Sequence, residues 1–223
     1  MKGRSLSCPP KAAALVLLVA LSVLGAARAN TVYVRCAVST KGSDTVTTVV
    51  AGTSPLRVPF DQTLTLQGIG FHITSANRAS INTLTIVPSG LAIDNTPIVR
   101  AIDGQITGAE VADLNADGSP EVYVYIRSAG SGSYGALVAF GVKQRQSLRE
   151  IHLPPVSEDA KAAQGYMGHD DFAVVEGTLV RRFPIYRDTD SNAAPSGGMR
   201  QLHYTLQAGE ASWQLQLDCM VDD

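Results

Sequence analysis

The sequence has little histidine and cysteine, and this shortage argues against a metal- or cofactor-dependent enzyme. It contains four histidines and three cysteines among 223 residues. It has no H-E-x-x-H zinc motif and no G-x-S-x-G nucleophile elbow. The histidines are scattered along the chain, at His72, His152, His169 and His203. We therefore expect a protein that is not an enzyme and that carries no cofactor.

One short stretch does combine a histidine with carboxylates. His169 is followed by Asp170 and Asp171, which in principle are groups for acid–base chemistry. Three adjacent polar residues after Gly168 are more typical of a turn that leads into the strand expected at Phe172. The turn is the preferred interpretation.

Long hydrophobic runs are also scarce, because only the N-terminus has one. Basic residues precede the apolar run Ala12 to Gly25, and a small-x-small triplet ends at Ala29. This pattern is typical of a secretory signal peptide. The run is shorter than the roughly 20 residues that a membrane-spanning helix needs. We expect residues 1–29 to be a signal peptide cleaved near Ala29, and residues 30–223 to form a single exported domain.

Basic residues are in the minority once the leader is removed. The whole chain has 18 Lys+Arg and 20 Asp+Glu, and residues 1–29 contain four of the basic residues and none of the acidic ones. The formal charge therefore changes from −2 to −6. An acidic surface argues against nucleic acid or an anionic membrane as a partner and favours a basic protein. Solubility alone is an equally good explanation of the charge.

Two cysteines remain after the leader, Cys36 and Cys219, near opposite ends of the exported chain. An even pair in an exported protein predicts a disulfide. Both lie in the apolar phase of alternating segments, one after Val32 and Val34 and the other after Leu215 and Leu217. The bridge should then join the first and last strands. Two free buried thiols are the alternative.

Hydrophobic residues alternate with polar ones along most of the chain, which predicts strands rather than helices. Short segments are separated by Gly, Asn, Asp, Pro and Ser, as in an antiparallel β-sandwich. One short helix is expected at Ser157 to Gln164, capped by Ser157 and ended by Gly165. The expected strands are Val32 to Cys36, Thr45 to Val50, Thr63 to Ile69, Thr83 to Val87, Pro97 to Ile102, Val122 to Arg127, Ala136 to Val142, Phe172 to Tyr186 with a break near Gly177, Gln201 to Gln207 and Trp213 to Cys219.

The connection DLNADGSPE has the D-x-N-x-D-G spacing of a calcium loop, with Asp113, Asn115 and Asp117. An EF-hand is excluded because Val124 occupies the position of its bidentate glutamate and a strand follows. A looser calcium site that adds Glu121 is one interpretation. A metal-free turn closed by the Asp and Asn side chains is the favoured one.

A second connection, Ser128 to Gly135, separates two strongly patterned strands and predicts a hairpin. Eight residues are more than closure of a hairpin requires. Serine hydroxyls, flexible glycines and the ring of Tyr134 are suited to contact a polar cleft. On composition alone, a binding loop and a plain hairpin are equally good interpretations.

Two runs of residues resemble a known family. They are DLNADGSPEVYVYIRSAGSGSYGALVAF and LVRRFPIYRDTDSNAAPSGGMRQLHYTL, and the likeness extends roughly from Thr63 to Leu217. They resemble the periplasmic inhibitors of invertebrate-type (i-type) lysozyme. The resemblance implies a small exported β-sandwich protein of the periplasm. It also implies a Ser-Gly-x-x-Tyr-type loop that enters the lysozyme active-site cleft and meets its catalytic carboxylates.

In this sequence the loop motif falls on Ser131, Gly132, Ser133, Tyr134 and Gly135. The resemblance implies that Ser131 donates a hydrogen bond to a catalytic carboxylate. Tyr134 would fill the sugar-binding cleft, and the two glycines would permit a tight loop.

The second run implies scaffold and a possible second contact loop at Arg187 to Arg200. A lysozyme inhibitor is therefore the leading hypothesis. A periplasmic glycan- or calcium-binding module without inhibitory activity is the alternative.

Overall fold

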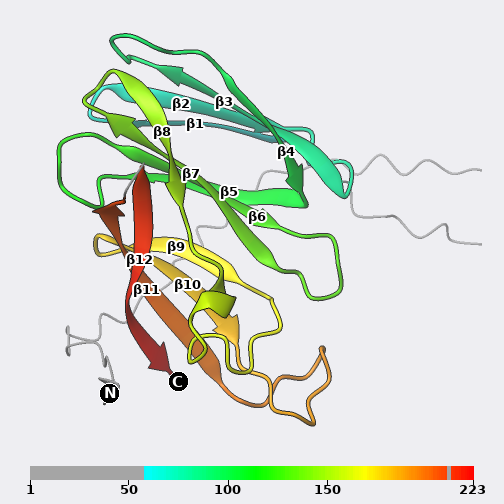
Figure 1. The fold of residues 1–223 in the computed structure, drawn as a ribbon. Helices are drawn as coiled ribbons and strands as arrows, with labels where there is room; N and C mark the ends of the chain where they lie inside the picture. The colour runs from blue at the N-terminus through cyan, green and yellow to red at the C-terminus, as the bar shows by residue number, and fades with distance from the viewer. Residues whose placement is uncertain (1–57, 210–211) are drawn as a thin grey trace, which may run out of the picture. The chain divides into compact units, whose positions relative to one another are not determined.

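The computed structural model describes residues 58–209 and 212–223, and the regular secondary structure of these residues is almost entirely β-strand (Figure 1). The expected signal peptide, the strands at Val32 to Cys36 and Thr45 to Val50, and Cys36 itself lie outside the described residues. A single 3-10 turn, η1, spans Val156–Glu158. The strands are β1 (Phe60–Leu66), β2 (Ile69–Ser75), β3 (Ile81–Ser89), β4 (Ile98–Asp103), β5 (Gln105–Ala112), β6 (Glu121–Arg127), β7 (Gly135–Lys143), β8 (Ser147–His152), β9 (Asp171–Val175), β10 (Thr178–Pro184), β11 (Met199–Ala208) and β12 (Trp213–Asp222).

The strands form two sheets. One has the order β1-β2-β3-β4, and the other has the order β5-β6-β7-β8-β12-β11-β10-β9. Neighbouring strands are antiparallel, except that β12 and β8 pair in parallel where Trp213 lies opposite Ile151. The predicted all-β, antiparallel fold is therefore confirmed. Within the described part of the chain, no helix is long and apolar enough to cross a bilayer.

The first hydrophobic core lies between the four-stranded sheet and one face of the β5–β7 region (Figure 1). Alternate residues of β2 and β3, among them Phe71 and Leu84, are fully buried there. They pack with alternate residues of β6, including Val122 and Val124. Burying apolar side chains from both sheets stabilises this layer by the usual hydrophobic term. It is the sandwich that the alternating pattern predicts.

The second core lies on the other face of the eight-stranded sheet. The remaining residues of β6, Tyr123 and Tyr125, pack there with Leu179, Phe183 and other side chains of β10–β12. β6 is therefore covered on both faces, which explains why six of its seven residues are buried. The carboxylate of Glu110 in β5 accepts a hydrogen bond from the backbone N–H of Val174 in β9, at 2.7 Å. That bond links the two edge strands, so the eight-stranded sheet approaches closure.

Two details of the strand prediction are wrong. The expected strand Thr63 to Ile69 crosses a tight turn, because Gln67 (φ 52°) and Gly68 (φ 78°) are both in the left-handed region. A glutamine at such a position gives no turn signal in the sequence. The segments β2, β5 and β8 were not predicted as separate strands.

The helix predicted at Ser157 to Gln164 is also wrong. The segment begins with η1, and Asp159 is then extended (φ −108°, ψ 105°), which interrupts any helical run. The side chain of Asp159, not that of Ser157, accepts the backbone N–H groups of Lys161 and Ala162, each at 2.9 Å. Only the ending was predicted correctly, since Gly165 does take a positive φ of 72°.

Cys219 lies in β12 and is 8% exposed, so its predicted burial is confirmed. Its expected partner Cys36 is outside the described residues, and the disulfide between them stays a prediction.

Candidate functional site

The predicted hairpin is confirmed. β6 and β7 pair in register, with Arg127 opposite Gly135 and Ile126 opposite Ala136. The connection, which we call the hairpin tip, comprises residues 128–134. It is one residue shorter than predicted because Gly135 already belongs to β7. The motif from Ser131 to Gly135 thus spans the tip and the first residue of the returning strand.

The hairpin tip is folded on itself by two backbone hydrogen bonds. The N–H of Ser128 donates to the carbonyl of Tyr134, and the N–H of Ser133 donates to the carbonyl of Gly130, each at 2.9 Å. Ser133 takes the left-handed conformation (φ 43°) to close the inner turn. A non-glycine residue in that region costs conformational energy and persists where its surroundings fix it.

Its surroundings do hold the tip from outside. The N–H of His169 donates to the Gly132 carbonyl at 2.8 Å, and the side-chain amide of Asn192 donates to the Ser131 carbonyl at 2.7 Å. The N–H of Gly135 donates to a carboxylate oxygen of Asp170, also at 2.7 Å. Three backbone groups of the motif are thus bonded by residues that are distant in sequence, and none of these bonds uses a side chain of the motif.

The serine and tyrosine of the motif are exposed. Ser131 is exposed and Tyr134 is 48% exposed, in a protein where most large hydrophobic side chains are buried. The ring of Tyr134 packs edge-on against Tyr166, with centroids 5.7 Å apart and planes at 74°. A half-exposed ring held in a defined orientation is a typical recognition element.

The motif glycines are required by close packing. A Cβ on Gly132 would lie 2.4 Å from the ring of Tyr134, and one on Gly135 would lie 2.5 Å from Cβ of Asp170. By contrast, a Cβ on Gly130, two residues before Gly132, would meet nothing within 4 Å. The tip therefore contains both a constrained and an unconstrained glycine.

A buried ion pair lies directly beneath the tip. Asp170 and Arg181 are 3% and 5% exposed, and Arg181 Nε donates to Asp170 Oδ1 at 2.6 Å. The hydroxyl of Tyr166 donates to Asp170 Oδ2 at 2.8 Å and accepts from Arg181 Nη2 at 2.7 Å. Burial raises the pKa of Tyr166 well above its ordinary value, so its hydroxyl stays protonated and remains a donor.

The second loop, Arg187 to Arg200, lies against the hairpin tip through Asn192. Asn192 also accepts from the Tyr186 hydroxyl with its carbonyl and contacts His169 Nε2 at 3.3 Å. Asp190 closes this loop by accepting the backbone N–H groups of Arg187 and Ser196. These bonds hold the pKa of Asp190 below its ordinary value.

Arg200, at the end of the second loop, is scaffold. It is 5% exposed, pairs with Asp222 at 2.7 Å, and donates to the carbonyls of Lys161, Ala162 and Gln164. The predicted scaffold role of this block agrees with these contacts. A direct contact of the second loop with a partner stays a prediction.

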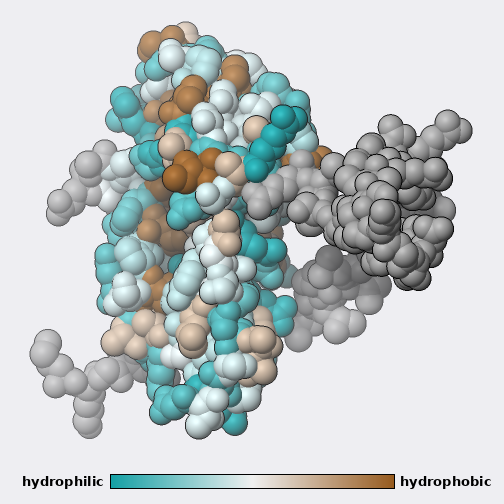
Figure 2. All heavy atoms as spheres, turned by 90° about the vertical axis from the view of Figure 1, so that its right-hand side faces the viewer, coloured by the Kyte–Doolittle hydropathy of each residue, from teal (hydrophilic) through white to brown (hydrophobic). Residues whose placement is uncertain are grey.

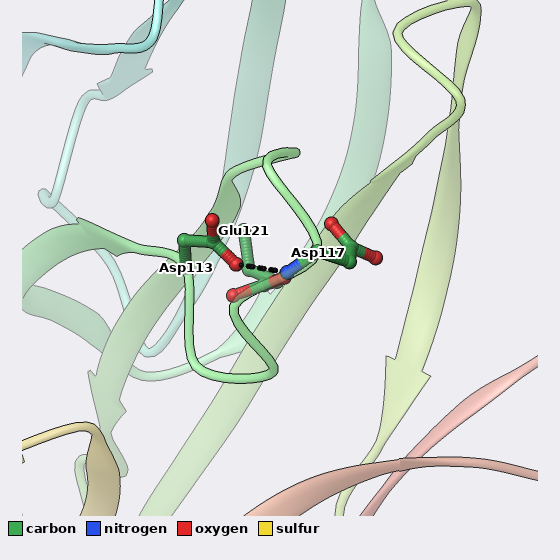
Figure 3. A group of neighbouring side chains, drawn as sticks. All are labelled: Asp113, Asp117 and Glu121. Atoms are coloured by element: carbon green, nitrogen blue, oxygen red, sulfur yellow. Dashed lines mark hydrogen bonds between the residues drawn. The ribbon is translucent and has the colours of Figure 1, made fainter.

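The acidic turn, Asp113 to Glu121, joins β5 to β6 at the opposite end of β6 from the hairpin tip. Figure 3 shows its three carboxylate side chains. Asp113 accepts the backbone N–H groups of Asp117 and Gly118, each at 3.0 Å. Asp117 accepts the N–H of Ser119 at 2.8 Å. Asn115 accepts the N–H of Asp117 with its side-chain oxygen at 3.2 Å, so the Asp and Asn side chains close the turn as predicted.

The acidic turn also brings three carboxylates together. Oxygens of Asp113, Asp117 and Glu121 lie within 4.8 Å of one another, a distance at which one cation could contact all of them. Glu121 is 2% exposed, and burial raises its pKa to about 7. A backbone N–H from Leu114 and the Tyr123 hydroxyl both donate to its Oε2. The predicted calcium ligands are thus close together, while most of their bonds serve the turn itself.

The histidines lie on different elements. His72 is in β2 and contacts Asp61 at 2.9 Å, His203 is in β11, and His169 faces Asn192 and stacks on Tyr186. Asp170 faces Arg181 instead of its neighbour His169. The preferred interpretation as a turn holds for His169, whose φ is positive (58°), and Asp170, which precede the strand, whereas Asp171 is already the first residue of β9.

His152 lines an open cleft of about 570 Å³ together with Glu150, Tyr166 and Arg181. A histidine and a carboxylate therefore line the same cleft. Both carboxylate oxygens of Glu150, however, accept from Arg100 in β4, at 2.6 and 2.8 Å. That pairing lowers the pKa of Glu150, which makes it a poor proton donor.

Sequence reasoning missed the residues that support the tip, namely Tyr166, Asp170, Arg181 and Asn192. One signal was available. In LVRRF, Leu179, Arg181 and Phe183 share the inward phase of β10, and an arginine in that phase requires a buried acidic partner. Nothing in the sequence indicates that the partner is Asp170 or that the pair lies under the hairpin.

The surface seen from the right-hand side of Figure 1 differs between its two halves (Figure 2). Hydrophobic patches gather in the upper half, and the lower half is mostly hydrophilic or neutral in colour. The exposed large hydrophobic residues on or beside the four-stranded sheet, within the described part of the chain, are Val58, Ile81, Val87, Ile93 and Val99.

A comparison with protein-family models agrees with the resemblance found in the sequence. Residues 93–164 match the family described as the periplasmic lysozyme inhibitor of I-type lysozyme. Comparisons with curated proteins and with solved structures give no match. The matched segment begins just before β4 and ends in the turns after η1. It contains the acidic turn, β6, the hairpin tip and β7. The part of this chain that presents Ser131 and Tyr134 is therefore similar to the lysozyme inhibitors.

Proposed function

We propose that the protein is a periplasmic inhibitor of i-type lysozyme that blocks the enzyme by inserting the hairpin tip into its active-site cleft. The family match supports a lysozyme-inhibitor role in general. The observation that carries the specific mechanism is that Ser131 and Tyr134 are exposed while the backbone between them is held from outside. A loop fixed before binding loses little conformational entropy on entering a cleft.

The two exposed side chains have complementary parts in this mechanism. The Ser131 hydroxyl donates to a catalytic carboxylate of lysozyme, an acceptor that is charged and therefore forms a strong hydrogen bond. Tyr134 occupies a sugar subsite with its ring, and its hydroxyl contacts polar groups at the end of that subsite. Occupation of the subsite excludes the glycan substrate, so inhibition is competitive.

Charge and export fit the same role. We propose that residues 1–29 direct the chain to the periplasm and that the remaining domain carries the −6 charge. An acidic inhibitor associates faster with a basic enzyme, and the association rate then falls as salt rises. In the periplasm, the protein meets lysozyme that has crossed the outer membrane and protects peptidoglycan from hydrolysis.

The direct test is residual lysozyme activity on bacterial cell walls in the presence of the exported domain. A panel of i-type, chicken-type and goose-type enzymes should show inhibition of the i-type enzyme, with a competitive dependence on substrate. If micromolar protein leaves all three enzymes fully active, the inhibitor proposal fails. Pull-down on peptidoglycan without lysozyme identifies the alternative, a glycan-binding module.

A further inference from the structure

We infer that the trio of Asp170, Arg181 and the partly buried Tyr166 is a positioning device that holds the hairpin tip in its binding conformation. The inference rests on the proposed function and names the residues that fix the conformation of the tip before lysozyme binds. None of the three belongs to the predicted motif. They act through Gly135 and Tyr134, which the trio contacts directly.

The trio contacts β7 at Gly135, where this strand leaves the hairpin tip. This strand pairs with β8 only from Ala139 to Lys143, so the paired region stops four residues short of Gly135. At Gly135, the Asp170 carboxylate accepts the backbone N–H at 2.7 Å. Cβ of Asp170 also fills the space where a side chain at position 135 would lie. The carboxylate therefore takes the place of a neighbouring strand where β7 leaves the tip.

Asp170 can do this because its own position is fixed. Oδ1 is held by Arg181 Nε at 2.6 Å, and Oδ2 receives both the Gly135 N–H and the Tyr166 hydroxyl. The guanidinium carbon of Arg181 lies 5.1 Å from the Tyr166 ring centroid and 5.3 Å from that of Phe172. A charged network this deeply buried is stable only with its partners in place.

The same network orients the aromatic ring of the tip. Tyr166 uses its hydroxyl in the network and its ring to contact Tyr134 edge-on. Its other contact is Phe183 in the second core, with centroids 4.7 Å apart. The orientation of Tyr134 is thereby connected to the core of the protein through one intervening ring.

A positioning role predicts a particular kinetic signature. Loosening the tip lowers the fraction of molecules in the binding conformation, which lowers the association rate constant for lysozyme and leaves the dissociation rate constant nearly unchanged. Loss of a contact residue such as Tyr134 instead raises mainly the dissociation rate constant. The two kinds of residue are therefore separable by binding kinetics.

The test uses Tyr166→Phe, which removes the hydroxyl and keeps the ring. Its matched control is Tyr123→Phe, which removes another buried tyrosine hydroxyl that faces a carboxylate, in this case Glu121 at the far end of β6. We expect Tyr166→Phe to slow association with lysozyme by about 3- to 10-fold, because the hydrogen bonds of its hydroxyl to Asp170 and Arg181 are lost. The control should associate at the wild-type rate, and Asp170→Asn should show a larger effect wherever it still folds.

A second measurement needs no lysozyme. Hydrogen exchange at the Gly135 amide should be faster in Tyr166→Phe than in the wild type or in Tyr123→Phe. Unchanged exchange at Gly135, or an effect on dissociation alone, would overturn the positioning role. If the wild type inhibits no lysozyme, the proposed function fails, and the exchange data still decide whether the trio holds the tip.

Discussion

The two loops at the ends of β6 are closed in different ways. The acidic turn, Asp113 to Glu121, is closed largely by its own side chains, which accept hydrogen bonds from N–H groups two to seven residues away. The hairpin tip is held by groups 35 to 61 residues away in sequence, Asp170 and Asn192. The acidic turn is also linked to distant segments, by the Gln67 amide that donates to Asp113 at 2.8 Å and by the Val142 N–H that donates to the Pro120 carbonyl at 3.1 Å, so the two loops differ in how much of their closure is local.

This difference determines what each loop can present. In the acidic turn, the carboxylates and amide that could bind a ligand are used to satisfy the backbone. In the hairpin tip, other segments donate to the carbonyls of Ser131 and Gly132, and the side chains of Ser131 and Tyr134 remain exposed. A loop that is supported from outside can be both rigid and available for binding.

The largest effect should come from a carboxylate that supports the tip. Asp170→Ala removes the partner of a buried arginine, which we expect to lower the free energy of unfolding by about 3 to 5 kcal/mol. Asp117→Ala, in the exposed acidic turn, removes only local hydrogen bonds and should lower the free energy of unfolding by a much smaller amount. Chemical denaturation of both variants measures the two values. Equal losses would show that the loops are supported in the same way.

Contact residues should affect inhibition and not stability. We expect Tyr134→Ala and Ser131→Ala each to weaken inhibition by about 1 to 4 kcal/mol, the range of residues at the centre of an interface. Both side chains are exposed, so the midpoint of denaturation should hardly change. Inhibition constants compared with melting temperatures provide the check. Unchanged inhibition in both variants would mean that another surface binds lysozyme.

The stability of the protein should depend on pH through Glu121 in the acidic turn. Burial raises the pKa of Glu121 from 4.5 to about 7, so the folded state binds this proton more tightly than the unfolded state does. The resulting stabilisation is complete below pH 4.5 and is lost as the pH rises through 7, by about 1 to 3 kcal/mol. In Glu121→Gln, the loss of stability with rising pH should be smaller. Denaturation midpoints of the two proteins between pH 4.5 and 8 give the measurement, and parallel curves would contradict it.

The two glycines of the tip, Gly130 and Gly132, should differ in how much their replacement by alanine weakens inhibition. In Gly132→Ala the new methyl group would lie 2.4 Å from the Tyr134 ring and must displace it, whereas Gly130→Ala meets nothing within 4 Å. We expect Gly132→Ala to weaken inhibition by about 1 kcal/mol through the displaced ring, within the usual cost of overpacking. Gly130→Ala should inhibit like the wild type. Equal inhibition by both variants would show that the orientation of Tyr134 is unimportant.

The two loops also differ in how well the sequence predicts them. The closure of the acidic turn follows from Asp113, Asn115 and Asp117 because the bonds are local and depend on spacing. The hairpin is predictable from the strands on each side of it. The support by Asp170 and Asn192 is not, because the approach of these residues depends on how β9, β10 and the second loop fold against β7. The same limit explains the wrong helix at Ser157 to Gln164, where local signals were overridden by the extended Asp159.

The smallest expected effect concerns calcium. Both oxygens of Asp113 and one oxygen of Asp117 already accept backbone N–H groups, and binding a cation would compete with these bonds. At pH below 7, a cation would also have to displace the proton of Glu121. We therefore expect millimolar calcium, compared with a chelator, to leave the melting temperature unchanged at pH 6 and at pH 8. A rise confined to pH 8 would instead identify the acidic turn as a calcium site that includes Glu121, since deprotonation would then be required for binding.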